Sequence, residues 1–251
     1  MKDQAERASR FRSLHRPGDP IVIFNAWDAG SAKTVAQAGA KAIGTGSWSV
    51  AAAFGYEDGE KLPLALAIEN LQRIVNSVDL PVTLDLEAGY ADIAQSVRAA
   101  ISAGAIGFNY EDGRMGAEGL EPIEEHAQRI RQARSAADAL VPGVYLNART
   151  DMFLRAKPEL HSQAMVEEAL ARADAYAKAG ADGLFVPGLS DPEKIRFICD
   201  RSPLPVNIMG KPGVTKRAEL AALGVARISY GPFPYRLAME ALKKAAEEGM
   251  R

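Results

Sequence analysis

The sequence predicts an α/β protein of the (β/α)8 TIM-barrel class, folded as a single domain over residues 1–251 with a short helical lead-in at 1–20. Three observations support this prediction. Short apolar strands alternate with helices, an Ala-Gly-Ala-like segment recurs before several strands, and acidic side chains follow successive strands. A length of 251 residues suits one barrel of this kind.

The recurring segment marks the passage from a helix to the next strand. Its clear copies begin at Ala38, Ala103 and Ala179, and a looser copy begins at Leu223. Glycine ends a helix at little cost because it adopts the left-handed conformation without a Cβ clash, and the small residue after it lets the chain turn tightly. Helix, glycine turn and strand in repeated order are typical of β/α units.

Reading the chain with this repeat yields eight expected strands. They lie near residues 21–27, 42–46, 82–87, 107–111, 144–149, 183–186, 205–208 and 227–230. Helices are expected between them, most clearly over 162–178, where apolar residues recur with a period of about 3.6, and the segment 235–250 is expected to be the last barrel helix. No Gly-x-Gly-x-x-Gly motif follows the first strand, which disfavours an open doubly wound sheet.

Composition limits the classes of function. A net charge of −2 gives no indication of nucleic acid or an anionic membrane as a partner. One cysteine, Cys199, excludes an intrachain disulfide and a cysteine metal cluster. Residues 1–16 lack the apolar core of a signal peptide, and no apolar run approaches the roughly 20 residues that cross a bilayer. We therefore expect a soluble, cytoplasmic protein.

Acidic side chains gather where the expected strands end. Asp85 and Glu87 are two residues apart at one strand end, so their side chains leave the same face of the extended chain. The next strand runs into Glu111 and Asp112, and the one after it ends in Arg149. Parallel α/β sheets keep their chemistry at these ends. A metal cation, or a proton held at a raised pKa, would relieve the repulsion between the acids.

Four segments together resemble the isocitrate lyase/phosphoenolpyruvate mutase superfamily. They are residues 25–32, residues 46–58, residues 85–90, and 111–112 paired with 148–151. The third, Asp-Leu-Glu-Ala-Gly-Tyr, is close to the family's D-x-[DE]-x-G-[YF]-G motif. The resemblance spans about 24–235. It implies an enzyme that makes or breaks a C–C or P–C bond next to a carboxylate, through an enolate of a pyruvate-like unit.

The resemblance also implies a metal site. Asp85 would coordinate Mg²⁺ directly, whereas Asp58, Glu87 and Glu111 would hold water molecules bound to the ion. Mg²⁺ prefers hard oxygen ligands and keeps several waters, so this acidic set suits its chemistry. Mn²⁺ is the alternative ion.

Substrate contacts follow from the same resemblance. The backbone N–H groups of Gly46, Ser47 and Trp48 would cradle the substrate carboxylate as a small anion nest, and Asp85 would meet the substrate through the metal. Arg149 would grip the leaving group or a second carboxylate, because its planar fork suits a bidentate contact. The catalytic residues implied in this way are Arg149, Asp58 and Glu111.

Structural roles compete with these assignments. Arg149 could be an internal ion-pair partner of Glu111 or Asp151, and Asp28 could cap the first barrel helix. Trp48 could simply pack at the mouth of the barrel. The three histidines lie away from the strand ends and are expected to be structural or surface residues, so no histidine general base is expected: His15, His126 and His161.

The chain departs from the lyases that it resembles. Those lyases carry a K-[KR]-C-G-H motif in a loop after the fourth strand, whereas residues 113–120 contain no cysteine, histidine or lysine. The glutamate or histidine that relatives place near the end of the sixth strand is replaced by Val-Pro-Gly at 186–188. Cleavage of isocitrate or methylisocitrate is therefore not expected, and the general acid or base is not identified.

These observations leave several functions open. The first hypothesis is a Mg²⁺-dependent lyase that cleaves or decarboxylates a 2-oxo or 2-hydroxy carboxylic acid. The alternatives are a P–C bond enzyme of the phosphonopyruvate mutase or hydrolase type, a non-catalytic barrel that binds a 2-oxo acid, and a metal-free isomerase that binds phosphate. A phosphonate needs more cationic contacts than Arg149 and Arg114 offer, which lowers the rank of the P–C enzyme.

The expected partners are a small-molecule acid substrate and further copies of the chain. Members of the superfamily form tetramers in which a C-terminal helix is exchanged between neighbours, so a homo-oligomer, a dimer or a tetramer, is implied. The chain ends soon after the last expected helix, which predicts that such an exchange is missing or reduced.

Overall fold

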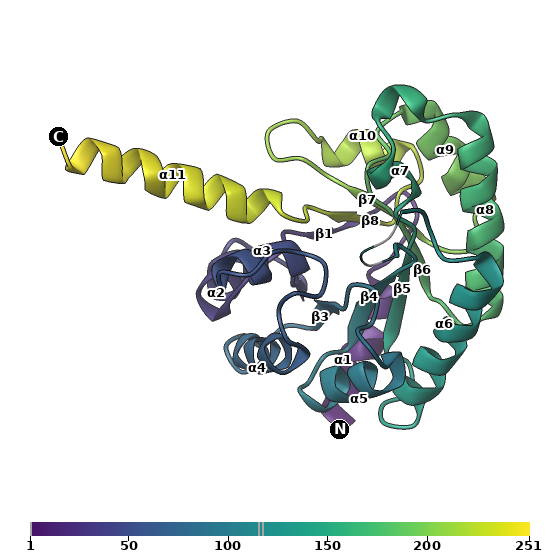
Figure 1. Ribbon diagram of the computed structural model, residues 1–251, viewed down its shortest axis with the longest axis horizontal. Coiled ribbons are helices and arrows are strands. Elements are labelled where there is room, and N and C mark those ends of the chain that lie inside the picture. The colour runs from purple at the N-terminus through teal and green to yellow at the C-terminus, as the bar shows by residue number, and fades with distance from the viewer. Residues whose placement is uncertain (1, 115, 117) are drawn as a thin grey trace.

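The computed structural model describes residues 2–114, 116 and 118–251. Its strands are β1 (Ile21–Ile23), β2 (Ile43–Gly44), β3 (Val82–Asp85), β4 (Gly107–Glu111), β5 (Tyr145–Arg149), β6 (Gly183–Val186), β7 (Val206–Met209) and β8 (Arg227–Ser229). All pairings are parallel, in the order β1-β8-β7-β6-β5-β4-β3-β2, so one sheet curls into a nearly closed barrel (Figure 1). The (β/α)8 barrel expected from the sequence is confirmed.

Helices connect the strands and surround the barrel (Figure 1). They are α1 (Lys2–Ser13), α2 (Ala29–Gln37), α3 (Ser47–Ala53), α4 (Leu64–Val75), α5 (Ile93–Ser102), α6 (Ile123–Asp138), α7 (Met152–Arg155), the 3-10 helix η1 (Pro158–Leu160), α8 (Gln163–Lys178), α9 (Pro192–Arg201), α10 (Arg217–Ala222) and α11 (Phe233–Gly249). Asp28 caps α2, because its Oδ1 accepts a hydrogen bond from the backbone N–H of Ser31 at 2.7 Å.

The first strand is shorter than the sequence suggested. β1 ends at Ile23 rather than near residue 27, because β1 and β2 diverge and meet only at the bridge between Ala26 and Thr45. Gly44 lies at this narrow point, and a Cβ there would come within 2.5 Å of the Ile23 side chain. The small residue in β2 therefore allows the two strands to approach.

The Asn25 side chain closes the barrel where the strand ladder is incomplete. Its amide nitrogen donates to the backbone oxygen of Thr45 at 2.8 Å. Its oxygen accepts from the backbone N–H groups of Tyr230 and Gly231 at 2.9 and 2.8 Å. One buried amide thus ties together the segments that follow β1, β2 and β8.

Helix α1 lies against the amino-terminal end of the barrel. Phe11 of this helix and His15, just beyond its end, pack against the ring of Tyr145 at the start of β5, with centroid distances of 5.5 and 3.9 Å. This small apolar cluster consists of Ala8, Phe11, Ile21, Ile23, Ala42, Ile106 and Tyr145. Most of its members stand at the beginning of strands, so α1 covers the end of the barrel opposite the carboxyl ends of the strands.

Helix α11 does not pack on the barrel as the last helix of a conventional barrel would. It projects away from the other elements (Figure 1), and Pro234 is the only buried residue among the described residues of this helix. Its first turn is held by Tyr235, whose ring packs against Trp27 and Trp48 at 5.2 and 5.9 Å. Beyond that turn the apolar side chains of Leu237 and Leu242 are 57% and 62% exposed.

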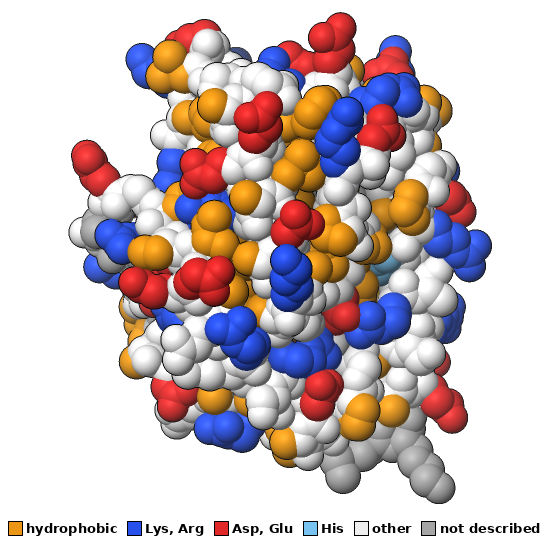
Figure 2. Space-filling view, turned by 90° about the vertical axis from the view of Figure 1, so that its right-hand side faces the viewer, with side chains coloured by type: hydrophobic (Ala, Val, Ile, Leu, Met, Phe, Trp, Pro, Cys, Tyr) orange, Lys and Arg blue, Asp and Glu red, His pale blue; other side chains and the backbone are white. Residues whose placement is uncertain are grey.

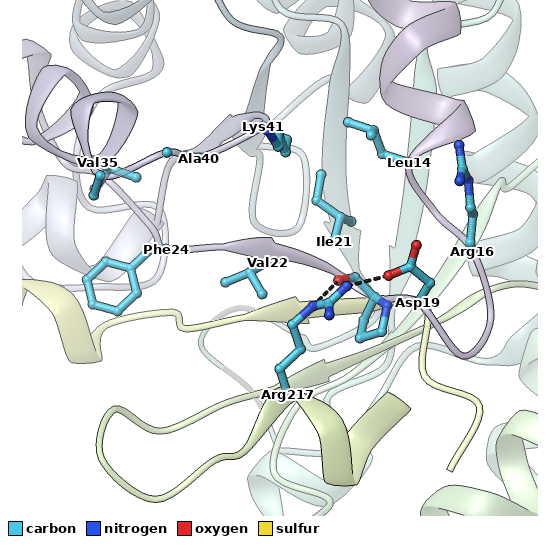
Figure 3. A pocket seen from close by; sticks show the side chains of 13 residues that line it. Leu14, Arg16, Asp19, Ile21, Val22, Phe24, Val35, Ala40, Lys41 and Arg217 are labelled. Carbon is cyan, nitrogen blue, oxygen red and sulfur yellow. Dashed lines mark hydrogen bonds and ion pairs between the residues drawn. The ribbon is translucent and has the colours of Figure 1, made fainter. Parts of the chain in front are cut away.

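The outer face of β1 is correspondingly left open. A groove of about 660 Å³ lies there, lined by apolar side chains that include Val22, Phe24 and Val35 (Figure 3). Arg217 spans one edge of it, with hydrogen bonds to the Asp19 carboxylate and the Pro20 carbonyl. A barrel helix after β8 would ordinarily cover this kind of surface.

The remaining surface gives little sign of a special environment. On the face shown in Figure 2, acidic and basic side chains are interspersed among apolar ones, as on an ordinary solvated surface. Within the described part of the chain, no helix combines the length and apolarity that crossing a membrane would demand.

The barrel-closing role of Asn25 predicts a large loss of stability on truncation. Asn25→Ala removes the Asn25 partner of the Thr45 carbonyl and of the Gly231 N–H, while the Tyr230 N–H keeps a backbone carbonyl as its acceptor. We expect the free energy of unfolding to fall by about 2–4 kcal/mol. Urea titration followed by circular dichroism measures this. Asn76→Ala, an exposed asparagine at the end of α4, is the matched control and should change it by less than about 0.5 kcal/mol. Equal effects of the two variants would contradict the role.

Candidate active site

A polar cavity of about 580 Å³ opens at the carboxyl ends of the strands. Its inner wall consists of side chains from the ends of β2 to β5 and the loops after them, namely Ser47, Asp58, Glu87, Glu111 and Arg149. The outer wall is formed by the segment after β4 and by α7, and includes Arg114, Glu118, Leu154 and Arg155. Five of the residues that the sequence predicted for the site therefore surround one space.

Asp85, at the end of β3, is held from two sides. Its Oδ2 accepts hydrogen bonds from the hydroxyl and the backbone N–H of Ser47 at 2.8 and 3.2 Å. Its Oδ1 accepts from the Asn109 side chain at 3.3 Å. Ser47 opens α3, so the N-terminus of that helix also presents its positive end to this carboxylate.

The predicted anion nest is only partly available. The backbone N–H of Gly46 donates to the carbonyl of Ala26 at 3.3 Å, and that of Ser47 donates to Asp85. The N–H of Trp48 belongs to the first turn of α3, where backbone donors have no acceptor within the helix. The Trp48 ring packs against Tyr235 and lies 4.4 Å from the Arg236 guanidinium.

Glu87 lies in a strained turn, and Glu60 holds this turn through two hydrogen bonds. Glu60, Glu87 and Tyr90 have φ values of 61°, 51° and 58°, and they are the non-glycine residues with positive φ among those described. The Glu60 N–H donates to Glu87 Oε2 at 2.7 Å, and the Tyr90 N–H donates to Glu60 Oε1 at 2.6 Å. Such conformations cost of the order of 1–3 kcal/mol each and persist only where the surroundings enforce them.

The sequence analysis missed Glu60. It lies within the Glu-Asp-Gly-Glu run at 57–60, and only Asp58 of that run matched the family motif. The one available signal was the glycine before it, which indicated a tight turn carrying acids on both sides. Contact between this turn and the one after β3 depends on the closed barrel, so local sequence could not reveal it.

Arg149 is surrounded by acids. Its Nη1 lies 2.7 Å from Glu111 and 3.9 Å from Asp85, and its Nε and Nη2 donate to both oxygens of Asp151 at 2.6 and 3.1 Å. Burial disfavours the charged guanidinium, but the negative charges of Glu111, Asp151 and Asp85 outweigh it and raise the pKa of Arg149. The expected ion pairs with Glu111 and Asp151 are therefore formed.

The carboxylates around Arg149 are poorly compensated. Burial, with the charges of Asp85 and Asp58, raises the pKa of Glu87 to about 7, although the Glu60 N–H opposes the shift. Burial and the nearby Asp85 raise the pKa of Asp58 as well. Burial also raises the pKa of Glu111 well above its usual value, against the attraction of Arg149. One arginine does not balance these acids, so the cluster must bind protons or another cation.

This donor set fits a hydrated divalent cation. Within the described residues, no group of three or more His, Cys, Asp or Glu side chains is placed so that together they could hold a metal ion directly. Mg²⁺ does not require such a group, since it commonly takes one or two carboxylates directly and keeps several waters. Asp85 would be the direct ligand, and the cavity beside it has room for water held by Asp58, Glu87 and Glu111.

A buried network behind the cavity supports Arg149. Asp112 is fully buried and accepts hydrogen bonds from the Tyr176 hydroxyl at 2.8 Å and from Arg172 at 3.0 Å. Its other oxygen accepts from the backbone N–H of Asp151 at 3.0 Å, which places the carboxylate that pairs with Arg149. Tyr176 and Arg172 lie on α8, and the sequence analysis did not single them out.

Crowding around Gly188, after the sixth strand, leaves no space for a side chain at that position. A Cβ at Gly188 would lie 2.6–2.7 Å from backbone atoms of Phe153 and Leu154, so the backbone of α7 fills the space next to this position. Its φ of 89° also favours glycine. The histidines lie elsewhere: His126 pairs with Glu121 behind β4, and His161 bonds to the Phe153 carbonyl.

Comparison with known proteins agrees with this geometry. The sequence profile of the phosphoenolpyruvate phosphomutase family matches residues 11–250. The chain belongs to this family. The resemblance to the isocitrate lyase/phosphoenolpyruvate mutase superfamily is thereby confirmed, as is the expectation of an enzyme related to carbon–carbon lyases.

Relatives of this phosphomutase-family protein are named for several different activities. A solved protein from Burkholderia cenocepacia J2315, provisionally named a phosphonomutase, is 52% identical over 98% of this chain and 99% of its own, with a TM-score of 0.95. The 2-methylisocitrate lyase of Bacillus subtilis (strain 168) is 28% identical, covering 97% and 82%. The oxaloacetate decarboxylase of Pseudomonas putida (strain KT2440) is 28% identical, covering 92% and 80%.

One solved protein that contains Mg²⁺ has the same fold as this chain. Phosphonopyruvate hydrolase, solved with oxalate and Mg²⁺, is 24% identical with a TM-score of 0.81 and covers 99% of this chain and 86% of its own. At this identity the likeness establishes a shared barrel. The relatives thus include a lyase and a decarboxylase, and the hydrolase has the same fold.

The raised pKa of Glu87 predicts how stability depends on pH. In the folded, metal-free protein Glu87 holds its proton up to about pH 7, whereas the unfolded chain releases it near 4.5. The folded state therefore binds more protons in this window, and stability falls as the pH rises from 4.5 to 7. The contribution is at most about 3 kcal/mol.

Urea unfolding in EDTA at pH 5 and pH 7.5 measures this dependence. Glu87→Gln, which keeps the shape but cannot ionise, should flatten it, and Glu240→Gln on the exposed part of α11 should leave it as in the wild type. If Glu87→Gln does not reduce the difference in the free energy of unfolding between pH 5 and pH 7.5, other acidic residues cause that difference.

Proposed function

We propose that this protein is a Mg²⁺-dependent lyase that breaks a C–C bond next to a carboxylate of a 2-oxo or 2-hydroxy acid, by cleavage or decarboxylation. The observation that carries this proposal is the convergence of Asp58, Glu87 and Glu111 with Arg149 on one cavity, beside Asp85. A bound Mg²⁺ would stabilise the negative charge that develops on the substrate's 2-oxo oxygen.

The protein's own groups would orient the substrate. The backbone N–H of Trp48, in the first turn of α3, can receive a substrate carboxylate, whereas the hydroxyl and N–H of Ser47 already donate to Asp85. Arg149 would hold the second anionic group, since its guanidinium lies inside the cavity wall and is rigidly paired with Asp151. Holding both ends keeps the scissile bond beside the acids.

Glu87 is our candidate for the proton-transferring group. A general acid or base works best when its pKa is close to the ambient pH. Burial raises the pKa of Glu87 to about 7 in the metal-free protein, and a nearby Mg²⁺ would lower that pKa and favour Glu87 as the base. The Tyr90 hydroxyl lies 3.4 Å from Glu87 Oε1 and could pass the proton onward. This pair would replace the loop cysteine that the chain lacks.

Cleavage of a P–C bond is the second candidate. It is favoured by Arg114 and Arg155, which line the outer wall of the cavity and add cationic groups that could meet a phosphonate. The relative provisionally named a phosphonomutase points in the same direction. Arg155, however, already donates to the carbonyls of Gly119 and Arg114, which orders the segment after β4. We rank the C–C reaction first.

A proton NMR time course with Mg²⁺ tests the reaction. The substrates are oxaloacetate, 2-methylisocitrate, 2,3-dimethylmalate and phosphonopyruvate, each with an EDTA control and a blank without enzyme. We expect metal-dependent loss of a C–C substrate, and Asp85→Asn should lower kcat/KM by about 10²–10³-fold. Asp200→Asn, a surface change on α9, is the control. Turnover of phosphonopyruvate alone would select the second candidate, and full activity of Asp85→Asn would refute the metal role.

We also propose that the protein is a homo-oligomer in which α11 packs on a second copy. Leu237, Met239 and Leu242 are exposed on a helix that leaves its own barrel, while the groove on β1 exposes apolar surface to solvent. Complementary apolar surfaces of this kind usually mark an interface. The helix is 17 residues long and matches the helix expected over 235–250, but it projects from the barrel and does not cover it.

Charge on α11 should disrupt this assembly. We expect Leu242→Glu to lower the molar mass measured by light scattering after gel filtration, because a carboxylate cannot be buried against the groove without a partner. Leu160→Glu places the same charge on an equally exposed leucine of η1 and should leave the molar mass unchanged. A wild-type protein that elutes as a monomer would refute the proposal.

A further inference from the structure

An arginine is buried inside the barrel without a carboxylate partner. Arg227, at the start of β8, is 1% exposed, and its partners are the Ser229 hydroxyl at 3.0 Å and Asn109 Oδ1 at 3.5 Å. Its Nη1 has no hydrogen-bond partner among the described residues. Burial lowers the pKa of Arg227 to about 10, against the influence of Tyr145 and Asp85. Such a group costs stability and calls for an explanation.

A line of amides joins this arginine to the candidate metal ligand. Asn109 lies on β4, and Asp85 and Asn147 are its register partners on β3 and β5. The Asn147 amide donates to Asn109 Oδ1 at 2.9 Å, and the Asn109 amide donates to Asp85 Oδ1 at 3.3 Å. The line therefore runs from the interior of the barrel to the carboxylate beneath the cavity.

We propose that Asn109 is a positioning residue for Asp85, and that Arg227 sets the direction in which the Asn109 amide points. The inference rests on the proposed function, in which Asp85 binds the metal directly. Neither residue would touch the ion or the substrate. Both would act by fixing the orientation of the Asp85 carboxylate.

The guanidinium of Arg227 determines which end of the Asn109 amide faces Asp85. An arginine side chain donates hydrogen bonds and cannot accept them, whereas an asparagine side chain can present either its oxygen or its NH₂ group. Because Arg227 stands on one side, the oxygen of Asn109 must face it. The NH₂ group must then face Asp85, whose ionised oxygens accept only.

Asp85 is consequently held at both oxygens. Ser47 donates to Oδ2 from the cavity side, and Asn109 donates to Oδ1 from within the barrel. Oδ2 already accepts two hydrogen bonds from Ser47, whereas Oδ1 accepts one from Asn109 and keeps a lone pair that can bind a cation. Partners of this kind orient metal ligands, and removing them typically weakens metal affinity about 10–100-fold.

A purely structural role for Arg227 makes a different prediction. The side chain also lies 5.9 Å from the Phe11 ring and could merely fill the end of the barrel. Replacing a buried, unpaired charge with an apolar residue of similar length is commonly neutral or stabilising. Stability and metal affinity should therefore change in different directions only if the arginine positions the ligand.

Mg²⁺ titration by calorimetry, paired with thermal melts in EDTA, separates the two roles. We expect Asn109→Ala and Arg227→Met each to weaken Mg²⁺ binding about 10–100-fold. Arg227→Met should keep or raise the melting temperature, and Arg227→Lys, which retains a donor, should recover part of the affinity. Asn70→Ala is the matched control, since Asn70 is also buried and donates to the Trp27 carbonyl, outside the line that joins Arg227 to Asp85.

Unchanged affinity in Arg227→Met, or an equal loss in Asn70→Ala, would overturn the positioning role. If the wild type binds neither Mg²⁺ nor Mn²⁺, the proposed function fails, and a second readout decides the inference. The side-chain amide signal of Asn109, assigned by its loss in Asn109→Ala, should shift in both Asp85→Asn and Arg227→Met in metal-free ¹⁵N–¹H spectra. A signal that stays in place would overturn it.

Discussion

The concentration of negative charge at the carboxyl end of the barrel is the constraint on which the rest of the site depends. Asp85 and Glu111 approach a single guanidinium, that of Arg149, Glu87 lines the same cavity, and burial removes most of the solvent that would screen these charges. Like charges in such surroundings either bind protons or bind a cation, and the raised pKa values express that requirement. Neighbouring groups serve to hold these carboxylates close together despite their repulsion.

Each carboxylate is restrained by a different part of the fold. Ser47 and Asn109 hold Asp85, and the turn containing Glu60 holds Glu87. Asp112, behind the sheet, fixes the backbone of Asp151 and through it the position of Arg149. These supports come from separate β/α units, so none of them exists until the barrel closes. The free energy stored in left-handed residues, buried ions and raised pKa values is therefore offset by packing of the whole domain.

The barrel is incompletely closed between β1 and β2. β1 and β2 share a single bridge, and Asn25 supplies the missing hydrogen bonds. With α11 directed outward, the surface next to β1 remains apolar and accessible. The same divergence that shortens β1 places Gly46 and Ser47 where α3 can aim its first turn at Asp85.

Local pattern by itself determined the barrel, the order of its strands, and the acids and arginine at their ends, because glycine turns, strand runs and motif spacing are properties of short segments. It also indicated the ion pairs of Arg149, which join residues at adjacent strand ends. Only the tertiary structure decided the roles of Glu60, Asn109, Arg172 and Arg227, and the outward course of α11. Their partners lie tens of residues away in the chain, and what a buried polar group contributes depends on which group the closed fold sets against it.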